Sequence, residues 1–189
     1  MSSPKEIEIK FRVHSTRRLI RRLRDAGFRL VTKRTHEMNT LYDLPHHPLR
    51  NRGELLRLRK YGPHWVLTHK AKGRAARHKI RVETETKVGD GIRMEAILYA
   101  LGLTPTFRYE KFRAEWSDGK GHVVLDETPI GMFGEIEGPA RWIDRTARSL
   151  GIAPADYITD TYTTLFFNWK KETGSPAEEM TFAAIGRGT

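Results

Sequence analysis

The sequence predicts an α+β fold in which antiparallel strands close into a barrel and helices pack outside it. Nearly every strand candidate carries charged residues at positions i and i+2, which lie on one side of a sheet. Segments with helical periodicity and capping residues separate several of these strands. The 189 residues are enough for a single globular domain with one fold.

The first strand is predicted over residues 6–13, where apolar and charged residues alternate. Ile7, Ile9 and Phe11 share one side, and Glu6, Glu8, Lys10 and Arg12 share the other. A helix follows, which Ser15 or Thr16 can cap and which Gly27 can end. Its arginines are interpreted as a solvated face: Arg17, Arg18, Arg21, Arg22 and Arg24.

The middle of the chain contains more strand candidates, at residues 34–41, 54–60, 65–72 and 80–88. Pro45, Pro48 and Gly53 predict a loop over residues 42–53. The basic, small-residue stretch 73–79 is predicted to be a mobile loop.

The second half alternates helix and strand signals. Asp90 can cap a helix at 92–101, and strands are predicted at 106–116, 122–127 and 133–137. Two more helices are expected at about 139–150 and 154–171. The domain is therefore expected to span residues 1–173, with a flexible C-terminal tail at 174–189.

The composition excludes some classes of function but does not identify one. Thirty-four Lys and Arg against 23 Asp and Glu give a net charge of +11, which attracts phosphate, nucleic acid or anionic lipid. The chain has no Cys, so disulfides, a thiolate nucleophile and Cys-ligated zinc are excluded. No stretch resembles a signal peptide or a membrane span, so we expect a soluble cytoplasmic protein with no membrane partner.

The charged strand faces carry the chemistry. On any one strand such a face could simply be an outer face exposed to solvent, but on seven strands together it predicts a charged barrel lining. Basic members would grip phosphate oxygens and acidic members would hold Mg²⁺ or Mn²⁺. The set comprises Glu6, Glu8, Lys10, Arg57, Arg59, Lys70, Lys72, Arg81, Glu83, Glu85, Lys111, Arg113, Glu115, Asp126, Glu135 and Glu137.

Seven short motifs in order resemble those of the CYTH family, the triphosphate tunnel metalloenzymes. The first is the ExExK strand Glu6-Ile7-Glu8-Ile9-Lys10. It is followed by Leu56-Arg57-Leu58-Arg59, Lys70-Ala71-Lys72, Arg81-Val82-Glu83, Lys111-Phe112-Arg113, Leu125-Asp126-Glu127 and Glu135-Ile136-Glu137. The resemblance covers roughly residues 5–170 and implies an antiparallel eight-stranded tunnel with helices outside it.

The resemblance also implies roles. Glu6, Glu8, Glu135 and Glu137 would bind metal together with Glu83 or Glu85, and Arg57, Arg59, Lys70, Lys111 and Arg113 would bind phosphate. Lys10 would contact phosphate or orient the attacking group, and Asp126 would lie near the reacting centre. Lys72 and Arg81 are further phosphate candidates, which cross-strand pairing could instead neutralise.

The leading hypothesis is metal-dependent hydrolysis of a triphosphate compound inside the tunnel. The tract Tyr42–Leu49 with Gly53 resembles that of cyclase-like and thiamine-triphosphatase-like members, so an organic or nucleoside triphosphate is expected. The alternative in the same fold is an adenylyl cyclase that makes cyclic AMP and pyrophosphate. Residues 1–5 lack the His-Phe element that precedes the first strand of class IV cyclases, which favours hydrolysis.

A noncatalytic RNA or polyphosphate binder is the second alternative, motivated by the pI of about 10.1 and by Arg74, Arg77, His78 and Lys79. Carboxylates facing the phosphates would not help such a binder, so the expected partner is a small triphosphate and not nucleic acid. The pattern leaves open whether the protein is a monomer or a homodimer.

Overall fold

The computed structural model describes residues 5–186. Eight antiparallel strands form a closed barrel, because β1 pairs with β9 on one side and with β6 on the other. The order around the barrel is β1-β9-β8-β7-β2-β3-β4-β6. The barrel strands are β1 (Lys5–Arg12), β2 (Arg29–Asp43), β3 (Leu55–Tyr61), β4 (His64–Lys70), β6 (Lys79–Val88), β7 (Thr104–Ser117), β8 (His122–Thr128) and β9 (Gly131–Glu137).

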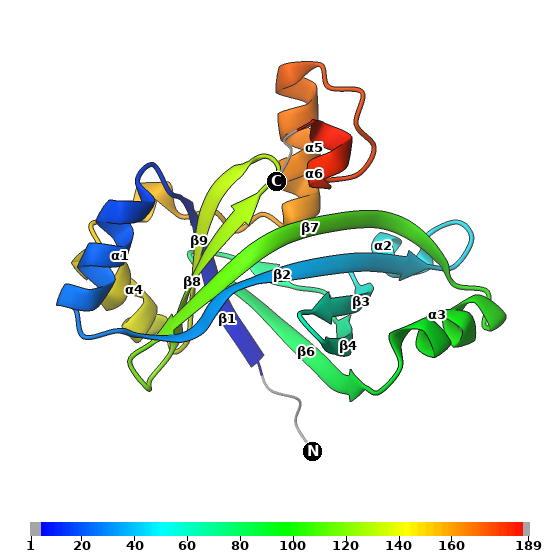
Figure 1. Ribbon diagram of the computed structural model, residues 1–189, viewed down its shortest axis with the longest axis horizontal. Coiled ribbons are helices and arrows are strands. Elements are labelled where there is room, and N and C mark those ends of the chain that lie inside the picture. Colours follow the sequence, from blue (N-terminus) through cyan, green and yellow to red (C-terminus); the bar gives the residue numbers. More distant parts are fainter. Residues whose placement is uncertain (1–4, 187–189) are drawn as a thin grey trace.

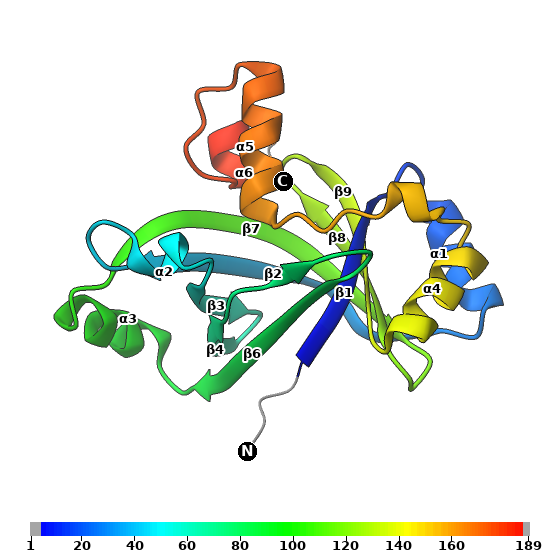
Figure 2. The same ribbon diagram turned by 180° about the vertical axis from the view of Figure 1, so that it is seen from behind.

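The helices pack against the outside of the barrel (Figure 1). α1 and α4 lie at one end of the molecule, α3 lies at the opposite end, and α5 and α6 stand beside β7, as the view from behind also shows (Figure 2). The helices are α1 (Thr16–Asp25), α2 (Pro48–Asn51), α3 (Gly91–Ala100), α4 (Ala140–Ser149), the 3₁₀ helix η1 (Pro154–Asp156), α5 (Tyr162–Thr173) and α6 (Phe182–Ile185).

The hydrophobic cores lie between the barrel wall and these helices. The largest cluster joins Ile9 and Phe11 of β1 to Leu23 of α1 and Ile143 of α4. A second cluster lies under α5, and a third lies under α3. Because the apolar side of each strand faces outward to a helix, the charged side of the same strand must face the barrel interior.

Local signals explain most of the element boundaries. Ser15 caps α1 by accepting the backbone N–H of Arg18, and Asp90 caps α3 in the same way at Ile92 and Arg93. The eight predicted strands and the predicted eight-stranded barrel are confirmed. No helix among residues 5–186 is long and apolar enough to cross a membrane.

Three segments differ from the expectation. Within the stretch 73–79, β5 (Arg74–Ala75) pairs with β6, and Lys79 already belongs to β6. The helix expected at 154–171 is divided, because Ile158 leaves the helical path to pair with Lys10 of β1. Residues 175–186 pack on the barrel, whereas a flexible tail was expected.

The packed C-terminal segment is anchored through β7. Met180 is fully buried and bridges to Tyr109, and the backbone N–H of Phe182 donates to Glu110 at 2.7 Å. Half of residues 175–186 are Ala, Met, Phe or Ile, and Ala177, Met180 and Phe182 are buried. The segment contains little regular structure beyond the short helix α6, so its order depends on a surface formed elsewhere in the chain. Residues 187–189 of the expected tail lie outside the described residues.

Candidate functional site

The barrel encloses a cavity of about 570 Å³ whose lining is mostly charged. Among residues 5–186, the lining contains nine Lys and Arg residues and seven Glu residues, contributed by six of the barrel strands. The lining cations are Lys5, Lys10, Arg57, Arg59, Lys70, Lys79, Arg81, Lys111 and Arg113, and the lining carboxylates are Glu6, Glu8, Glu83, Glu85, Glu115, Glu135 and Glu137.

The acidic side of the cavity lies where β1 meets β9 and β6. In the β1–β9 ladder Glu8 lies opposite Glu137, and Lys10 lies opposite Glu135. The Nζ of Lys10 is 2.9 Å from Glu8 and 3.3 Å from Glu135. Burial opposes the charge on Lys10, but Glu135 and Glu8 outweigh it and raise its pKa. Lys10 is therefore a fixed cation and not a proton acceptor.

Glu8 keeps its charge for the complementary reason. Burial alone would raise its pKa, but Lys10 and Lys79 outweigh burial and the charge of Glu135 and lower the pKa to about 2. The Nζ of Lys79 lies 3.0 Å from Glu8. The sequence analysis placed Lys79 in the basic stretch 73–79 and not in the cavity lining, although it stands two positions before Arg81 and continues the same period of two.

Two other carboxylates on the acidic side have raised pKa values. Burial, together with a hydrogen bond to Glu83, raises the pKa of Glu6 to about 7. Burial and the charges of Glu6, Glu8 and Glu135 raise the pKa of Glu137 to about 7. The Glu137 carboxylate makes no hydrogen bond or ion pair with any side chain among residues 5–186. An unpaired, largely buried carboxylate beside others of its kind is suited to binding a cation.

The carboxylates do not form a closed metal cage. Among residues 5–186 no three acidic or imidazole groups converge on one point as a ready-made ligand set. Mg²⁺ commonly takes one or two carboxylates and completes its octahedron with water and substrate phosphate oxygens. The acidic side therefore fits an ion that arrives with its anionic ligand better than a permanently caged one.

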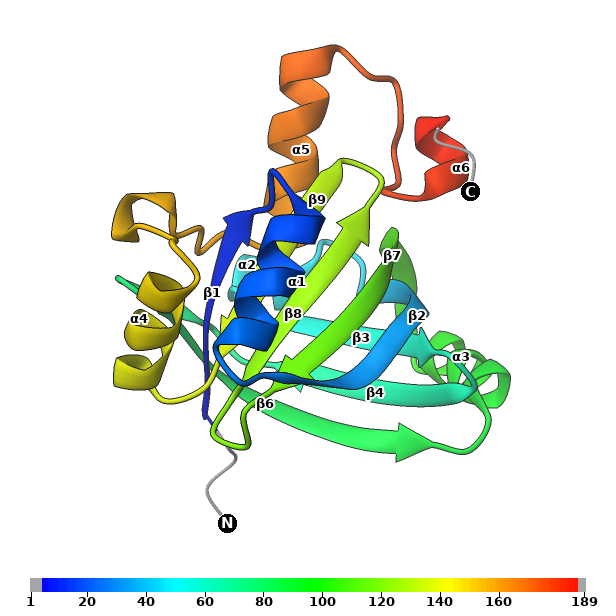
Figure 3. The ribbon, with the colours of Figure 1, turned by 60° about the vertical axis from the view of Figure 1, so that its left-hand side comes forward.

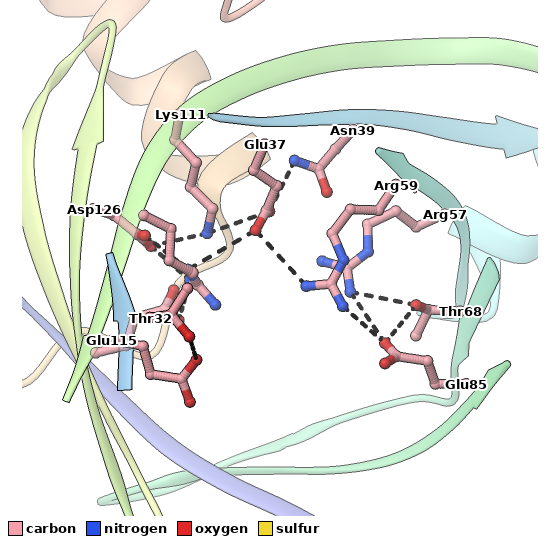
Figure 4. Close-up of polar contacts among 12 residues, drawn as sticks. Thr32, Glu37, Asn39, Arg57, Arg59, Thr68, Glu85, Lys111, Glu115 and Asp126 are labelled. Atoms are coloured by element: carbon pink, nitrogen blue, oxygen red, sulfur yellow. Dashed lines mark hydrogen bonds and ion pairs between the residues drawn. The ribbon is translucent and has the colours of Figure 1, made fainter. Parts of the chain in front are cut away.

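The basic side of the cavity comes from β3 and β7 and is held by two buried carboxylates (Figure 4). Asp126 of β8 is fully buried and accepts from Lys111 Nζ at 2.8 Å and from Arg113 Nε at 2.8 Å. It also accepts the hydroxyl hydrogen of Tyr162, from the start of α5, at 2.7 Å. Asp126 thus lies behind Lys111 and Arg113 and is not part of the cavity lining.

Glu37 of β2 is the second buried carboxylate, and the sequence analysis did not select it. It is fully buried between Lys111 and Arg59, with Lys111 Nζ at 3.6 Å and Arg59 Nη1 at 3.7 Å (Figure 4). Burial opposes its ionisation, but Lys111, Arg113 and Arg59 outweigh burial and lower its pKa to about 2. Glu37 and Asn39 stand at i and i+2 in a predicted strand, so the periodic signal for them was present.

The structure brings most of the predicted site residues together. Thirteen of the fifteen residues with a predicted role line the cavity: Glu6, Glu8, Lys10, Arg57, Arg59, Lys70, Arg81, Glu83, Glu85, Lys111, Arg113, Glu135 and Glu137. Glu115 of the predicted charged set lines it with them. Asp126 lies behind the lining, and Lys72 is exposed beyond the end of β4. Lys72 is displaced because β4 ends at Lys70, so the expected alternation does not continue to it.

Two lining residues have partners that bear on their predicted roles. The Arg81 guanidinium donates to the carbonyl oxygens of Gly53, Lys70 and Ala71, so it holds two connecting loops at the cavity. Glu85 contacts Arg59 at 3.1 Å and Thr68 at 3.0 Å, so it pairs with a residue of the basic side (Figure 4). These contacts support a structural role for Arg81 and a pairing role for Glu85.

Comparison with known proteins agrees with this geometry. The sequence profile of the CYTH domain matches residues 4–162. A protein of Methanocaldococcus jannaschii named "putative adenylate cyclase" is 25% identical over 133 residues, which are 70% of this chain and 75% of that protein.

Solved structures share the fold. A structure titled as a putative adenylate cyclase from Vibrio parahaemolyticus has a TM-score of 0.77 and 21% identity, covering 87% of this chain and 99% of that one. A Hippeastrum protein, titled a putative adenylyl cyclase that reveals a dominant triphosphatase activity, has a TM-score of 0.64 and 19% identity, covering 86% of this chain and 95% of that one.

The profile match spans most of the chain, and its charged strand motifs meet in one closed barrel. The protein therefore belongs to the CYTH family of triphosphate tunnel enzymes.

Proposed function

We propose that this protein hydrolyses a triphosphate compound in the barrel cavity, with a divalent metal ion as cofactor. The observation that carries the proposal is the division of the cavity into a cationic side, built on Arg57, Arg59, Lys111 and Arg113, and an acidic side with the unpaired Glu137. A ligand that satisfies both sides must carry several negative charges and be accompanied by a cation. A metal-bound triphosphate has this combination.

The metal ion would be held by Glu6 and Glu137, with Glu8 and Glu135 close by. Burial and the charges of neighbouring carboxylates raise the pKa values of Glu6 and Glu137, so a cation bound there would relieve their repulsion, whereas nearby lysines and Arg113 already keep Glu8 and Glu135 ionised with lowered pKa values. When bound, Mg²⁺ or Mn²⁺ would supply charge neutralisation at the phosphate oxygens.

The protein's own groups would position the phosphates. Arg59 is partly exposed in the cavity, and its contact with Glu85 can be exchanged for one with a phosphate oxygen. Arg113 and Lys111 are held rigidly by Asp126, so their charges would need little rearrangement to stabilise the transition state. Lys10, which stays protonated, would add a fixed positive charge on the acidic side.

The reaction is then a displacement at phosphorus. A water oxygen forms a bond to the terminal phosphorus, the bond from that phosphorus to the bridging oxygen breaks, and orthophosphate and a diphosphate compound leave. Asp126 acts through Lys111 and Arg113 in this scheme, because it is buried behind them and touches no cavity space. It is a positioning residue rather than a catalytic one.

The cavity size supports an organic or nucleoside triphosphate. A volume near 570 Å³ lies within the range of about 300–1,000 Å³ in which small organic ligands bind. The apolar and aromatic part of the lining is limited to Leu55, Val124, Tyr109 and Tyr162. Recognition is therefore expected to depend mainly on the phosphates.

A second candidate function is an adenylyl cyclase, and the name of the M. jannaschii relative favours it. In that reaction the 3′ hydroxyl of ATP would attack the α-phosphate and pyrophosphate would leave. The same charged groups would serve both reactions, and the products distinguish them.

A product assay tests the proposed function. Purified protein with Mg²⁺ or Mn²⁺ is incubated separately with ATP, thiamine triphosphate and tripolyphosphate, and orthophosphate, pyrophosphate and cyclic AMP are resolved. We expect orthophosphate from at least one organic triphosphate, and no product after chelation of the metal. Cyclic AMP with pyrophosphate would instead establish the cyclase, and the absence of turnover would contradict both.

Replacing Glu137 with Gln removes one charge and preserves side-chain size. We expect Mn²⁺ to bind at least about tenfold more weakly, because an ionic ligand is lost. Calorimetry in the presence of the diphosphate product measures this binding. Metal-dependent turnover should fall with it. Glu127→Gln is the matched control, since Glu127 pairs with Arg34 outside the cavity. Equal metal binding by wild type and Glu137→Gln would exclude Glu137 as a ligand.

Arg59→Ala is expected to weaken substrate binding by roughly 1.5–3 kcal/mol, the loss of a charge-assisted hydrogen bond. This corresponds to a KM increase of roughly 10- to 150-fold. Arg93→Ala on α3 is the control, because Arg93 is exposed, pairs with Asp90 at the surface and does not line the cavity. Steady-state kinetics checks the prediction, and an unchanged KM for Arg59→Ala would remove Arg59 from the phosphate site.

Glu37→Gln tests the support of the cationic side. The lowered pKa of Glu37 stabilises the fold above about pH 4.5, and this contribution disappears as pH falls toward 2. We therefore expect the variant to be less stable by roughly 3 kcal/mol at pH 7, with the difference shrinking below pH 4. Denaturant unfolding across pH measures it.

The same variant should raise KM, because Lys111 and Arg59 lose the carboxylate between them. Glu37→Asp, which keeps the charge, should restore part of the KM effect. Equal KM values for wild type and a folded Glu37→Gln would show that Glu37 is only structural.

A further inference from the structure

The charges of the barrel interior are balanced. Nine lysines and arginines line the cavity, and seven glutamates line it with them. The buried Glu37 and Asp126 directly behind the lining complete the balance. The net charge of +11 therefore comes from the outer surface and is not explained by the cavity.

The two helices at one end of the molecule carry much of this excess. α1 and α4 together contain eight arginines and two aspartates, with no lysine or glutamate. They are neighbours, since Arg22 of α1 donates to the carbonyl of Leu150 at the end of α4 and both helices share one apolar cluster (Figure 3). The exposed arginines of these helices form what we call the arginine face: Arg17, Arg18, Arg21, Arg24, Arg141, Arg145 and Arg148.

The arginine face gathers many arginines without carboxylate partners on two adjoining helices. None of its seven side chains forms an ion pair with a carboxylate among residues 5–186. Elsewhere in the same range, exposed arginines with such a partner within 4 Å are Arg34, Arg52, Arg77, Arg93 and Arg108, and those without one are Arg12, Arg29, Arg50 and Arg74. Seven unpaired positive charges on adjoining helices repel one another, which costs stability unless an anion binds.

The spacing of arginines on the arginine face indicates a ligand with phosphates at regular intervals. Arg17, Arg21 and Arg24 follow one another by four and three residues, so they share a side of α1. At a rise of about 1.5 Å per residue these arginines are roughly 5–6 Å apart along the helix. Guanidinium groups bind phosphate oxygens bidentately. A row of them suits a polymer with a phosphate at every repeat.

A lipid bilayer fits this face poorly. A helix that binds a membrane surface inserts exposed apolar side chains between the lipids. The apolar side chains Leu19 and Leu23 of α1 are buried in the core, and no large exposed apolar residue belongs to α1 or α4. The partner is therefore one that is recognised by charge alone.

We propose that the arginine face binds nucleic acid through its sugar-phosphate backbone, independently of base sequence. The sequence analysis did not expect a nucleic-acid partner, because carboxylates face the cavity, but the arginine face is a separate surface on the outside of the barrel. The proposal does not depend on the reaction inside the cavity. The arginine face would give the protein a second binding site, on the outside of the barrel wall and separate from the cavity.

The test uses a fluorescein-labelled 20-nucleotide RNA with a 5′ hydroxyl, which carries no triphosphate for the cavity. Anisotropy titrations with the full-length protein at several salt concentrations give the affinity and its salt slope. Arg17→Glu/Arg21→Glu should bind at least about tenfold more weakly and lower the slope of log K against log salt by roughly 1.4. Arg141→Glu/Arg145→Glu should act in the same direction.

The matched control is Arg50→Glu/Lys171→Glu, which changes the net charge equally at exposed positions on α2 and α5. It should bind RNA nearly as tightly as the wild type. All variants should keep their circular dichroism spectrum and their triphosphatase activity. Equal loss in the control would show that net charge alone is responsible and overturn the proposal. Failure of the wild type to bind RNA, or binding only to phosphatidylserine vesicles, would also overturn it.

Discussion

The pairing of opposite charges inside the barrel is the constraint on which the rest of the structure depends. Moving an ion from water into the protein interior costs on the order of several kcal/mol, and only close pairing with good geometry offsets that cost. Lys111 and Arg113 are tolerated because Asp126 and Glu37 contact them, and Lys10 is tolerated because it lies between Glu8 and Glu135. The register of the strands is set by these pairs as well as by backbone hydrogen bonds, because a shift by one residue would turn every charged row to the outside.

A charged interior cannot supply the main folding free energy, so the apolar contacts lie on the opposite face of each strand. Three clusters between the barrel and the helices fill this role. The close packing at β1 shows how little space is left: a side chain on Gly134 would collide with the ring of Phe11. The helices therefore hold the barrel closed from outside, and its interior remains available for a ligand.

Charge balance within the cavity has a functional consequence. In the free protein the lining cations are paired with lining carboxylates, as Arg59 is with Glu85 and Lys70 is with Glu6. An anion alone would have to break such pairs and leave carboxylates without partners. A phosphate chain that arrives with a metal ion replaces both members of a pair, which explains why acidic and basic groups occur together in this site. The positive excess of the chain is then located on the outside, largely at α1 and α4.

The sequence by itself determined the barrel strands and thirteen residues that line the cavity, because a period of two directly assigns alternate residues to one face of a sheet. Only the tertiary structure decided how deep each charge lies and which partner it meets. Asp126 lies behind the cations it holds, Glu37 enters the site from a long strand, and Lys72 falls beyond the end of β4. The order of residues 175–186 likewise depends on β7. These features depend on closure of the barrel, which brings together strands far apart in the chain, and local periodicity contains no information about which distant strand a residue will face.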